Sequence, residues 1–212
     1  SQIVPGASYD EPAMRDAVRR LLTQLDLRDV TMLGESMGAV LALTAAADLP
    51  DRVRRVVAVN AYDYAGGILR SSLLARLIIT GVIAPGTGPL LAGLEPKPVM
   101  RAILSGGLAD RTALREDYLD ELLSVGRHPG YPAVARGVYR NLPTLIAARG
   151  RYAEVTAPVH LIYGDKDWSR PSDRQANKQL LPRAEFTQVP NASHFIALER
   201  PDVPASLLNS VA

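Results

Sequence analysis

The sequence predicts an α/β fold in which a mostly parallel β-sheet is interrupted by an inserted helical segment. Three observations support this prediction. Strand-type and helix-type segments alternate at both ends of the chain, a long middle stretch shows only helix-type patterns, and the strand-type segments are short and apolar. Such alternation is typical of βαβ units, in which helices bury both faces of a parallel sheet.

The composition is that of a globular protein with one sizeable core. The 212 residues are 47% hydrophobic and 22% charged. The 24 basic and 22 acidic residues give a net charge of +2 and are scattered along the chain, which argues against a nucleic-acid partner. The absence of cysteine excludes disulfides and cysteine nucleophiles. His128, His160 and His194 lack the spacing of metal ligands, so we expect no metal site.

No segment has the roughly 18 to 20 uncharged apolar residues that a membrane span requires. The nearest candidate, residues 73–85, is shorter and contains Arg76. The first residues, SQIVPGASYDEP, show neither the basic start nor the apolar segment of a signal peptide. We therefore expect a protein without a membrane span, located in the cytoplasm.

The first part of the chain has the pattern helix, strand, helix, strand. Asp10 can cap a helix that has Pro12 in its first turn. Apolar residues then follow at the spacing of one helical face: Met14, Ala17, Val18, Leu21, Leu22 and Leu25. Residues 30–33 and 53–59 are predicted to be buried strands, and residues 36–47 a helix that is apolar nearly all round.

Between residues 63 and 155 the pattern predicts helices and no convincing strand. The expected helices are 71–83, 98–108, 113–125 and 131–148. The strand pattern returns at 159–163, followed by a helix at 172–181, a strand at 184–189 and a helix at 203–211. We therefore expect three parts: a core segment 1–62, a helical lid or cap 63–155, and a second core segment 156–212.

The stretch VTMLGESMGAV, residues 30–40, places a serine on a sharp turn between a strand and a helix. Glycine is expected at positions 34 and 38 because side chains there would collide with neighbouring backbone. Ser36 would then be strained with its hydroxyl protruding, and the backbone N–H of Met37 would point from the helix N-terminus toward the same place. This arrangement suits a nucleophile whose attack creates a negatively charged oxygen.

A serine nucleophile needs a base, and the base needs an acid that orients it. His194 lies in VPNASHFIALERP, after the last predicted strand, and Asp165 and Asp167 follow the preceding strand in VHLIYGDKDWSRP. A loop histidine is often an exposed bystander, and aspartates after a glycine often only form turns. The candidates nevertheless all follow the carboxyl ends of predicted parallel strands, where open α/β sheets build their sites.

Taken together, GESMG, the helical insert, GDKD and SHFIALERP make the chain resemble the α/β-hydrolase superfamily over essentially its whole length. The resemblance implies a serine hydrolase with a nucleophile elbow and a catalytic triad of Ser36, His194 and Asp167. It also implies that Asp165 is a turn residue, that the N–H of Met37 belongs to the oxyanion hole, and that no cofactor is needed.

The resemblance further implies an esterase that acts on a small-molecule acyl substrate, most simply a carboxylic ester with an apolar portion. Two alternatives stay open. The same triad serves carbon–carbon bond hydrolases and cofactor-free perhydrolases in this superfamily, and a protein of this fold can also bind a ligand without catalysis.

The insert is expected to roof the active site and select the substrate. Its apolar residues indicate either an apolar ligand or the insert's own core; they are Leu73, Leu74, Leu77, Ile78, Ile79, Val82, Ile83, Leu90 and Leu91. A second set could also reach a ligand, although periodicity assigns it no role: Tyr62, Tyr64, Tyr131, Tyr139, Arg136 and Arg140.

The chain departs from the superfamily pattern at its start. Members have several strands and a glycine-containing oxyanion loop before the nucleophile strand, and these are missing upstream of Ser36. The opening SQIVPGASYDEPAM resembles the segment after the superfamily's G-x-G-x-S turn, with Ser1 in the place of that serine. We therefore expect the C-terminal part of a longer protein, with the strand at 30–33 as an apolar edge. The expected partner is an N-terminal segment of the same protein that completes the sheet.

Overall fold

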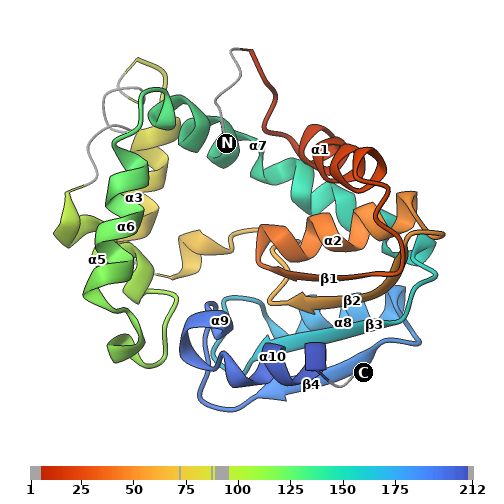
Figure 1. Ribbon diagram of the computed structural model, residues 1–212. Coiled ribbons are helices and arrows are strands. Elements are labelled where there is room, and N and C mark those ends of the chain that lie inside the picture. The colour runs from red at the N-terminus through yellow and green to blue at the C-terminus, as the bar shows by residue number, and fades with distance from the viewer. Residues whose placement is uncertain (1–5, 72, 87, 89–95, 210–212) are drawn as a thin grey trace.

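The computed structural model describes residues 6–71, 73–86, 88 and 96–209 (Figure 1). Its sheet has four parallel strands in the order β1-β2-β3-β4. The strands are β1 (Val30–Glu35), β2 (Val53–Val59), β3 (Val159–Gly164) and β4 (Glu185–Val189). The predicted parallel α/β sheet is confirmed. Because all four strands run in one direction, their carboxyl ends lie at one edge of the sheet, and the loops that follow them can meet there.

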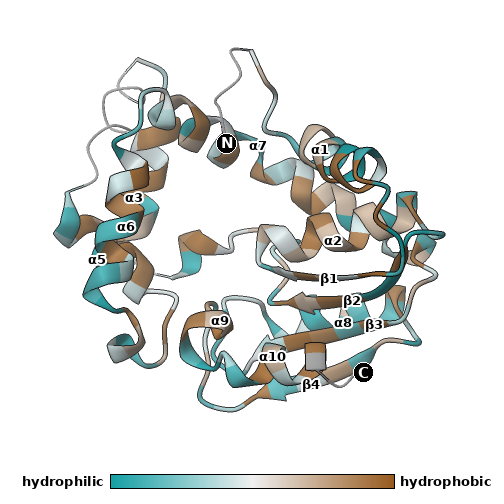
Figure 2. Cartoon of the chain, in the orientation of Figure 1, coloured by the Kyte–Doolittle hydropathy of each residue, from teal (hydrophilic) through white to brown (hydrophobic). Residues whose placement is uncertain are grey.

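Helices cover both faces of this sheet (Figure 1). One face carries α1 (Glu11–Gln24), α2 (Met37–Asp48) and α8 (Pro171–Leu180), and the other carries α9 (Ile196–Glu199) and α10 (Asp202–Asn209). Side chains of β2 alternate between the two layers: Val56 and Ala58 join the core under α2, whereas Val57 and Val59 join the core under α10. The central strands are brown, that is hydrophobic, in Figure 2 for this reason.

The helix α1 begins where the sequence predicts, because the Asp10 carboxylate accepts a hydrogen bond from the backbone of Ala13 at 2.9 Å. Its buried face is narrower than its apolar face. Leu22 is buried in the core, but Leu21 and Leu25 are 55% and 61% exposed. Both lie roughly 60–100° round the helix from Leu22, on a side that the described residues leave open. The apolar face seen in the sequence is therefore only partly buried in the described part of the chain.

Between β2 and β3 the described residues form helices and no strand, as predicted. The elements are η1 (Ile68–Arg70), α3 (Leu73–Ile83), α5 (Lys97–Ser105), η2 (Arg111–Ala113), α6 (Glu116–Gly126), α7 (Tyr131–Ala148) and η3 (Arg149–Glu154). The helices α3, α5 and α6 stand beside the core, and α7 runs from them to α1 and α2 (Figure 1).

The sequence predictions differ from the observed elements in two respects. The ends of helices and strands are displaced by up to three residues, and the short helices η1, η3 and α9 were not predicted. Ser1, Leu90, Leu91 and the last residues of the predicted helix 203–211 lie outside the described residues. No helix in the described ranges is long and apolar enough to cross a membrane.

A buried polar cluster joins the two ends of the helical insert to the core. The Asp63 carboxylate, just after β2, accepts hydrogen bonds from the Tyr152 hydroxyl of η3 at 2.9 Å and from the Asn177 amide of α8 at 2.7 Å. Burial raises the pKa of Asp63 to about 6, although the nearby Arg149 guanidinium and both hydrogen bonds favour the charged form. The insert is therefore anchored through a carboxyl group that changes charge near neutral pH.

Replacing Asp63 with asparagine is expected to remove one pH dependence of stability. The folded carboxyl keeps its proton to about pH 6, whereas the unfolded one loses it near 3.8. Between pH 3.8 and about 6 the folded state therefore binds more protons than the unfolded state. As the pH rises through this range, the contribution of Asp63 lowers the free energy of unfolding by about 3 kcal/mol. Urea unfolding across this window should show a smaller fall for Asp63→Asn than for the wild type. The exposed-site variant Asp51→Asn is the control, and an unchanged slope in Asp63→Asn would contradict the assignment.

Candidate active site

Ser36 occupies a strained turn between β1 and α2. Its backbone has φ 58° and ψ −119°, a conformation that L-residues rarely adopt. Two hydrogen bonds hold it there: the Ser36 N–H donates to the carbonyl of Val59 at 2.9 Å, and the Ser36 carbonyl accepts from the N–H of Tyr62 at 3.1 Å. The end of β2 thus fixes the turn. Met37 is the first residue of α2, so its N–H lies among those without an intrahelical partner.

The two glycines of GESMG have different roles. A Cβ at Gly34 would lie 2.1 Å from the carbonyl oxygen of Gly38 and 2.6 Å from the nitrogen of Ala39. Backbone cannot move aside, so glycine is required at position 34. The prediction was wrong for Gly38, where an added Cβ meets nothing within 4 Å among the described residues. The physical reason is that Gly38 lies on the first turn of α2 beside an open cavity.

These two positions make a matched pair of tests. Gly34→Ala is expected to destabilise the protein by about 3 kcal/mol or more, because the methyl group would overlap backbone atoms. Gly38→Ala is expected to leave stability unchanged or raise it by up to about 1 kcal/mol, since alanine favours the helix. Urea unfolding of both variants measures the difference. A stable Gly34→Ala would show that the close approach at position 34 is not needed, and an equal loss of stability in Gly38→Ala would show that position 38 is crowded as well.

The structure brings together the three side chains that the sequence singled out. The Ser36 hydroxyl lies 2.9 Å from Nε2 of His194, although the two residues are 158 positions apart. Nδ1 of the same ring lies 2.6 Å from Oδ1 of Asp167. His194 is fully buried. An ionised Asp167 can only accept hydrogen bonds, so Nδ1 of the imidazole carries the proton, and Nε2 is free to accept the hydrogen bond of the Ser36 hydroxyl. Asp165, two residues before, is exposed.

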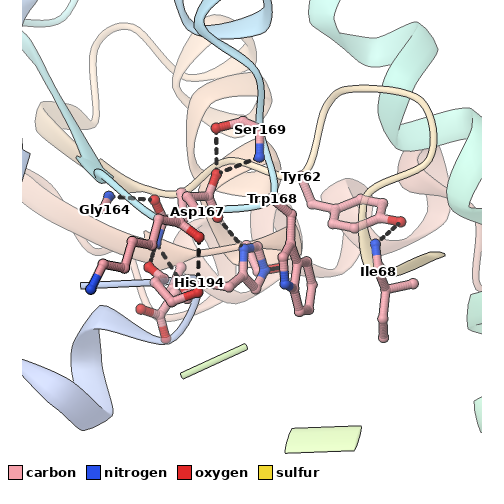
Figure 3. A network of polar contacts seen from close by, with 12 residues as sticks. Tyr62, Ile68, Gly164, Asp167, Trp168, Ser169 and His194 are labelled. Atoms are coloured by element: carbon pink, nitrogen blue, oxygen red, sulfur yellow. Dashed lines mark hydrogen bonds and ion pairs between the residues drawn. The ribbon is translucent and has the colours of Figure 1, made fainter. Parts of the chain in front are cut away.

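The surroundings of Asp167 keep it charged. Burial acts to raise its pKa, but the hydrogen bond from His194 and those from the backbone and hydroxyl of Ser169 outweigh it and hold the pKa below its usual value. Figure 3 shows Asp167 between Ser169 and His194. The Arg174 guanidinium donates to the Ser169 hydroxyl oxygen at 2.9 Å, which directs the hydroxyl proton toward Asp167. The carboxylate is therefore available to orient the imidazole at neutral pH.

The His194 ring is held by aromatic contacts as well. The Trp168 indole stacks on it, with ring centroids 3.8 Å apart and planes 12° from parallel (Figure 3). The Phe195 ring approaches it edge-on at 5.2 Å. The indole N–H of Trp168 donates to the carbonyl of Gly106 at 3.0 Å. In the sequence, the only indication of this stack is that Trp168 directly follows Asp167.

A cavity of about 400 Å³ opens beside Ser36. One wall is a single face of α7, formed by Tyr131, Val134, Ala135, Val138, Tyr139 and Leu142. These residues follow the helical pattern i, i+3, i+4, i+7, i+8 and i+11. The pattern is visible in the sequence, but it could not show what the face covers. Met37, Ile68, Trp168 and Phe195 contribute further apolar surface.

The residues of α3 that were considered for ligand contact do not line this cavity. Ile79 and Val82 are buried within the insert, whereas Leu73 and Leu77 are 72% and 63% exposed. Arg136 donates from Nε to the carbonyl of Val82 at 3.0 Å and from Nη2 to the carbonyl of Ala84, also at 3.0 Å. It caps the end of α3 and so joins two helices of the insert. The insert's own core thus accounts for Ile79 and Val82.

A parallel sheet with a serine turn after one strand, and with the acid and histidine after two others, defines the α/β-hydrolase fold. A family model described as "Alpha/beta hydrolase family" matches residues 4–206. The protein belongs to the alpha/beta hydrolase family, and the resemblance seen in the sequence is confirmed.

Several known proteins are similar to this chain. The sn-1-specific diacylglycerol lipase ABHD11 of Mus musculus is 26% identical over 202 residues, which are 93% of this chain and 62% of the lipase. The non-heme chloroperoxidase CPO-A1 of Kitasatospora aureofaciens is 29% identical over 211 residues, covering 90% of this chain and 69% of that protein. The chain thus spans about two thirds of the length of these relatives.

Solved structures show the same fold. The haloalkane dehalogenase DatA from Agrobacterium tumefaciens, crystallised as a variant, superposes with a TM-score of 0.81 at 19% identity. The match covers 97% of this chain and 74% of the dehalogenase. The arrangement of sheet and helices is therefore shared with this dehalogenase.

Proposed function

We propose that this protein is a serine hydrolase that cleaves carboxylic esters with an apolar portion. The observation that carries the proposal is the continuous hydrogen-bonded line from the Ser36 hydroxyl through His194 to Asp167, beside a largely apolar cavity. Membership of the alpha/beta hydrolase family supports it, as does the similarity to a lipase, an enzyme named for a neutral ester substrate.

The reaction would proceed through an acyl-enzyme. His194 accepts the proton of Ser36 at Nε2 while Oγ attacks the ester carbonyl carbon. The oxygen of the tetrahedral intermediate becomes negative and is stabilised by the N–H of Met37 at the start of α2. When the ester C–O bond breaks, His194 returns the proton to the departing alcohol. Water, deprotonated by the same imidazole, then releases the acid from Ser36.

The cavity favours an uncharged substrate. Its described lining contains no lysine or arginine, and its titratable groups besides the triad are the Glu35 carboxyl and tyrosine hydroxyls. A substrate carboxylate placed there would lose its hydration without gaining a cation. The α7 face instead offers apolar area for an acyl or alcohol chain. We propose that the insert acts as the lid that selects such substrates.

We expect p-nitrophenyl hexanoate to be hydrolysed with a kcat/KM at least about tenfold higher than that of p-nitrophenyl hemisuccinate, because the second ester carries a free carboxylate. The two esters share a leaving group, so the comparison reports on the acyl side alone. Steady-state assays of the protein, with the Ser36→Ala variant as the blank, measure the ratio. Preference for the hemisuccinate would contradict the neutral-substrate proposal without affecting the triad.

We also propose that further polypeptide of the same protein pairs with the open edge of β1 and completes the sheet. In the described part of the chain β1 ends the sheet, Leu33 on it is 39% exposed, and Leu21 and Leu25 of α1 are exposed as well. An apolar edge of this kind promotes association. The 212-residue chain should therefore self-associate in sedimentation experiments, and Leu33→Lys should reduce this. A monomeric 212-residue chain with full hydrolase activity would overturn the proposal.

A further inference from the structure

One loop of the insert lies directly against the loop that carries His194, residues 190–195, called the histidine loop here. This loop, residues 106–110 between α5 and η2, is called the docking loop here. The carbonyl of Gly107 accepts hydrogen bonds from the N–H of His194 at 2.9 Å and from the N–H of Phe195 at 3.1 Å. A Cβ at Gly107 would lie 2.4 Å from the Phe195 ring and 3.0 Å from Trp168. The docking loop can therefore approach the histidine only because residue 107 is glycine.

One carboxylate connects the two loops. Oε1 of Glu199, at the end of α9, accepts hydrogen bonds from the backbone N–H groups of Ala109 and Asp110 in the docking loop. Its Oε2 accepts from the N–H of Ser193, the residue before His194, at 2.6 Å. Three backbone donors from two separate segments thus share a single side chain, and hydrogen bonds to a charged acceptor are among the stronger ones.

The core holds the same histidine loop from the opposite side. The Asn60 side chain, at the end of β2, donates to the carbonyls of Ser193 and His194, both at 2.8 Å, and accepts from the N–H of Gly164 at 3.0 Å. The sheet therefore fixes the carbonyl groups of this loop, while its N–H groups bond to the docking loop and to Glu199. The backbone position of His194 depends on the insert as well as on the sheet.

We propose that Glu199 is a positioning residue that couples docking of the insert to the geometry of His194, so that the triad is assembled only when the docking loop is in place. This inference rests on the proposed serine hydrolase function, because His194 acts there as the base. The insert then contributes to catalysis through the backbone at residues 106–110 in addition to forming the cavity.

The chemistry requires a carboxylate at position 199. A glutamine has one acceptor oxygen and one donor NH₂ group. In Glu199→Gln the oxygen can accept from the docking loop or from Ser193, but not from both. The NH₂ group then faces the backbone N–H of the segment that has lost its acceptor. Because glutamine has nearly the same shape as glutamate, the variant removes the link between the docking loop and Ser193 while it keeps the packing of the side chain. A small displacement of a catalytic group costs rate steeply. We expect the rate constant of Ser36 labelling by a fluorophosphonate to fall about 10- to 100-fold in Glu199→Gln.

The test compares Glu199→Gln with wild type and with Glu121→Gln, a matched change at an exposed position of α6. Labelling rates are measured at a temperature at which circular dichroism shows all three proteins folded. The low-field proton NMR signal of the imidazole N–H that faces Asp167 is recorded in parallel. We expect slow labelling and a weakened signal in Glu199→Gln alone. If that variant does not fold, Gly107→Ala replaces it under the same criteria, because its methyl group separates the loops independently.

Wild-type labelling and an unchanged imidazole signal in a folded Glu199→Gln protein would overturn the proposal and assign Glu199 a purely structural role. Failure of the proposed function has a different signature, since the wild type itself would then not be labelled. In that case amide hydrogen exchange at Ser193 and His194 still decides the inference. Faster exchange in the variant supports the coupling, and equal exchange overturns it.

Discussion

Replacing Ser36 with alanine is expected to lower the kcat for p-nitrophenyl hexanoate by about a million-fold and to abolish fluorophosphonate labelling. In the proposed reaction the Ser36 hydroxyl forms the acyl bond, and alanine has no hydroxyl to place 2.9 Å from the imidazole. The substitution should leave the turn in place, because the backbone of Ser36 is held by hydrogen bonds to Val59 and Tyr62. The folded fraction should therefore stay close to that of the wild type.

The matched control for this change is Ser206→Ala on the exposed surface of α10. It should keep wild-type turnover and labelling. Intact-protein mass spectrometry after fluorophosphonate treatment then assigns the modified residue directly. Labelling that persists in Ser36→Ala would place the nucleophile elsewhere, and a folded wild type that is never labelled would favour the ligand-binding alternative.

The second largest effect is expected for Asp167→Asn, with kcat/KM lower by about 10⁴-fold. The asparagine amide offers a donor where His194 Nδ1 needs an acceptor, so the ring is driven to the tautomer that carries its proton on Nε2. Such an imidazole cannot accept the proton of Ser36. The carboxylate is also the acceptor for two hydrogen bonds from Ser169, and these would be lost or reversed.

Asp165→Asn is the matched control, because it makes the same chemical change two residues away on an exposed turn. Steady-state kinetics should show near wild-type values for Asp165→Asn and the large loss only for Asp167→Asn. Equal losses in both variants would indicate that the turn itself, and not the contact of Asp167 with His194, is responsible.

Much of the fold was predictable because its signals are local. Apolar runs bounded by glycine and charged residues predicted the four strands, and α7 was predicted with the same bounds that the structure shows. The elbow was recognised from the residues around Ser36, since a strand that enters a helix through one turn needs a small residue at position 34. Position 38 was misjudged, because whether a side chain there meets other atoms depends on the cavity beside it.

The candidate site was predictable in its chemistry but not in its supports. Ser36, Asp167 and His194 follow strand ends in the order typical of the superfamily, and a parallel sheet brings strand ends together. The stack of Trp168 on His194 and the hydrogen bonds of Asn60 and Glu199 had no local signal. They join segments that are distant in the sequence, and the contacts of Glu199 depend in addition on how the insert packs on the sheet.

Local sequence patterns were sufficient to predict the succession of strands and helices, the serine turn, and a candidate serine, histidine and pair of aspartates at strand ends, because spacing, turn residues and chemistry are properties of short stretches. The three-dimensional structure was needed to show that Asp167 contacts the imidazole while Asp165 is exposed, that α7 supplies one wall of the cavity, and that the insert holds the backbone of His194. The physical reason is that these contacts arise from close packing between distant elements, which chain order does not encode in any single segment.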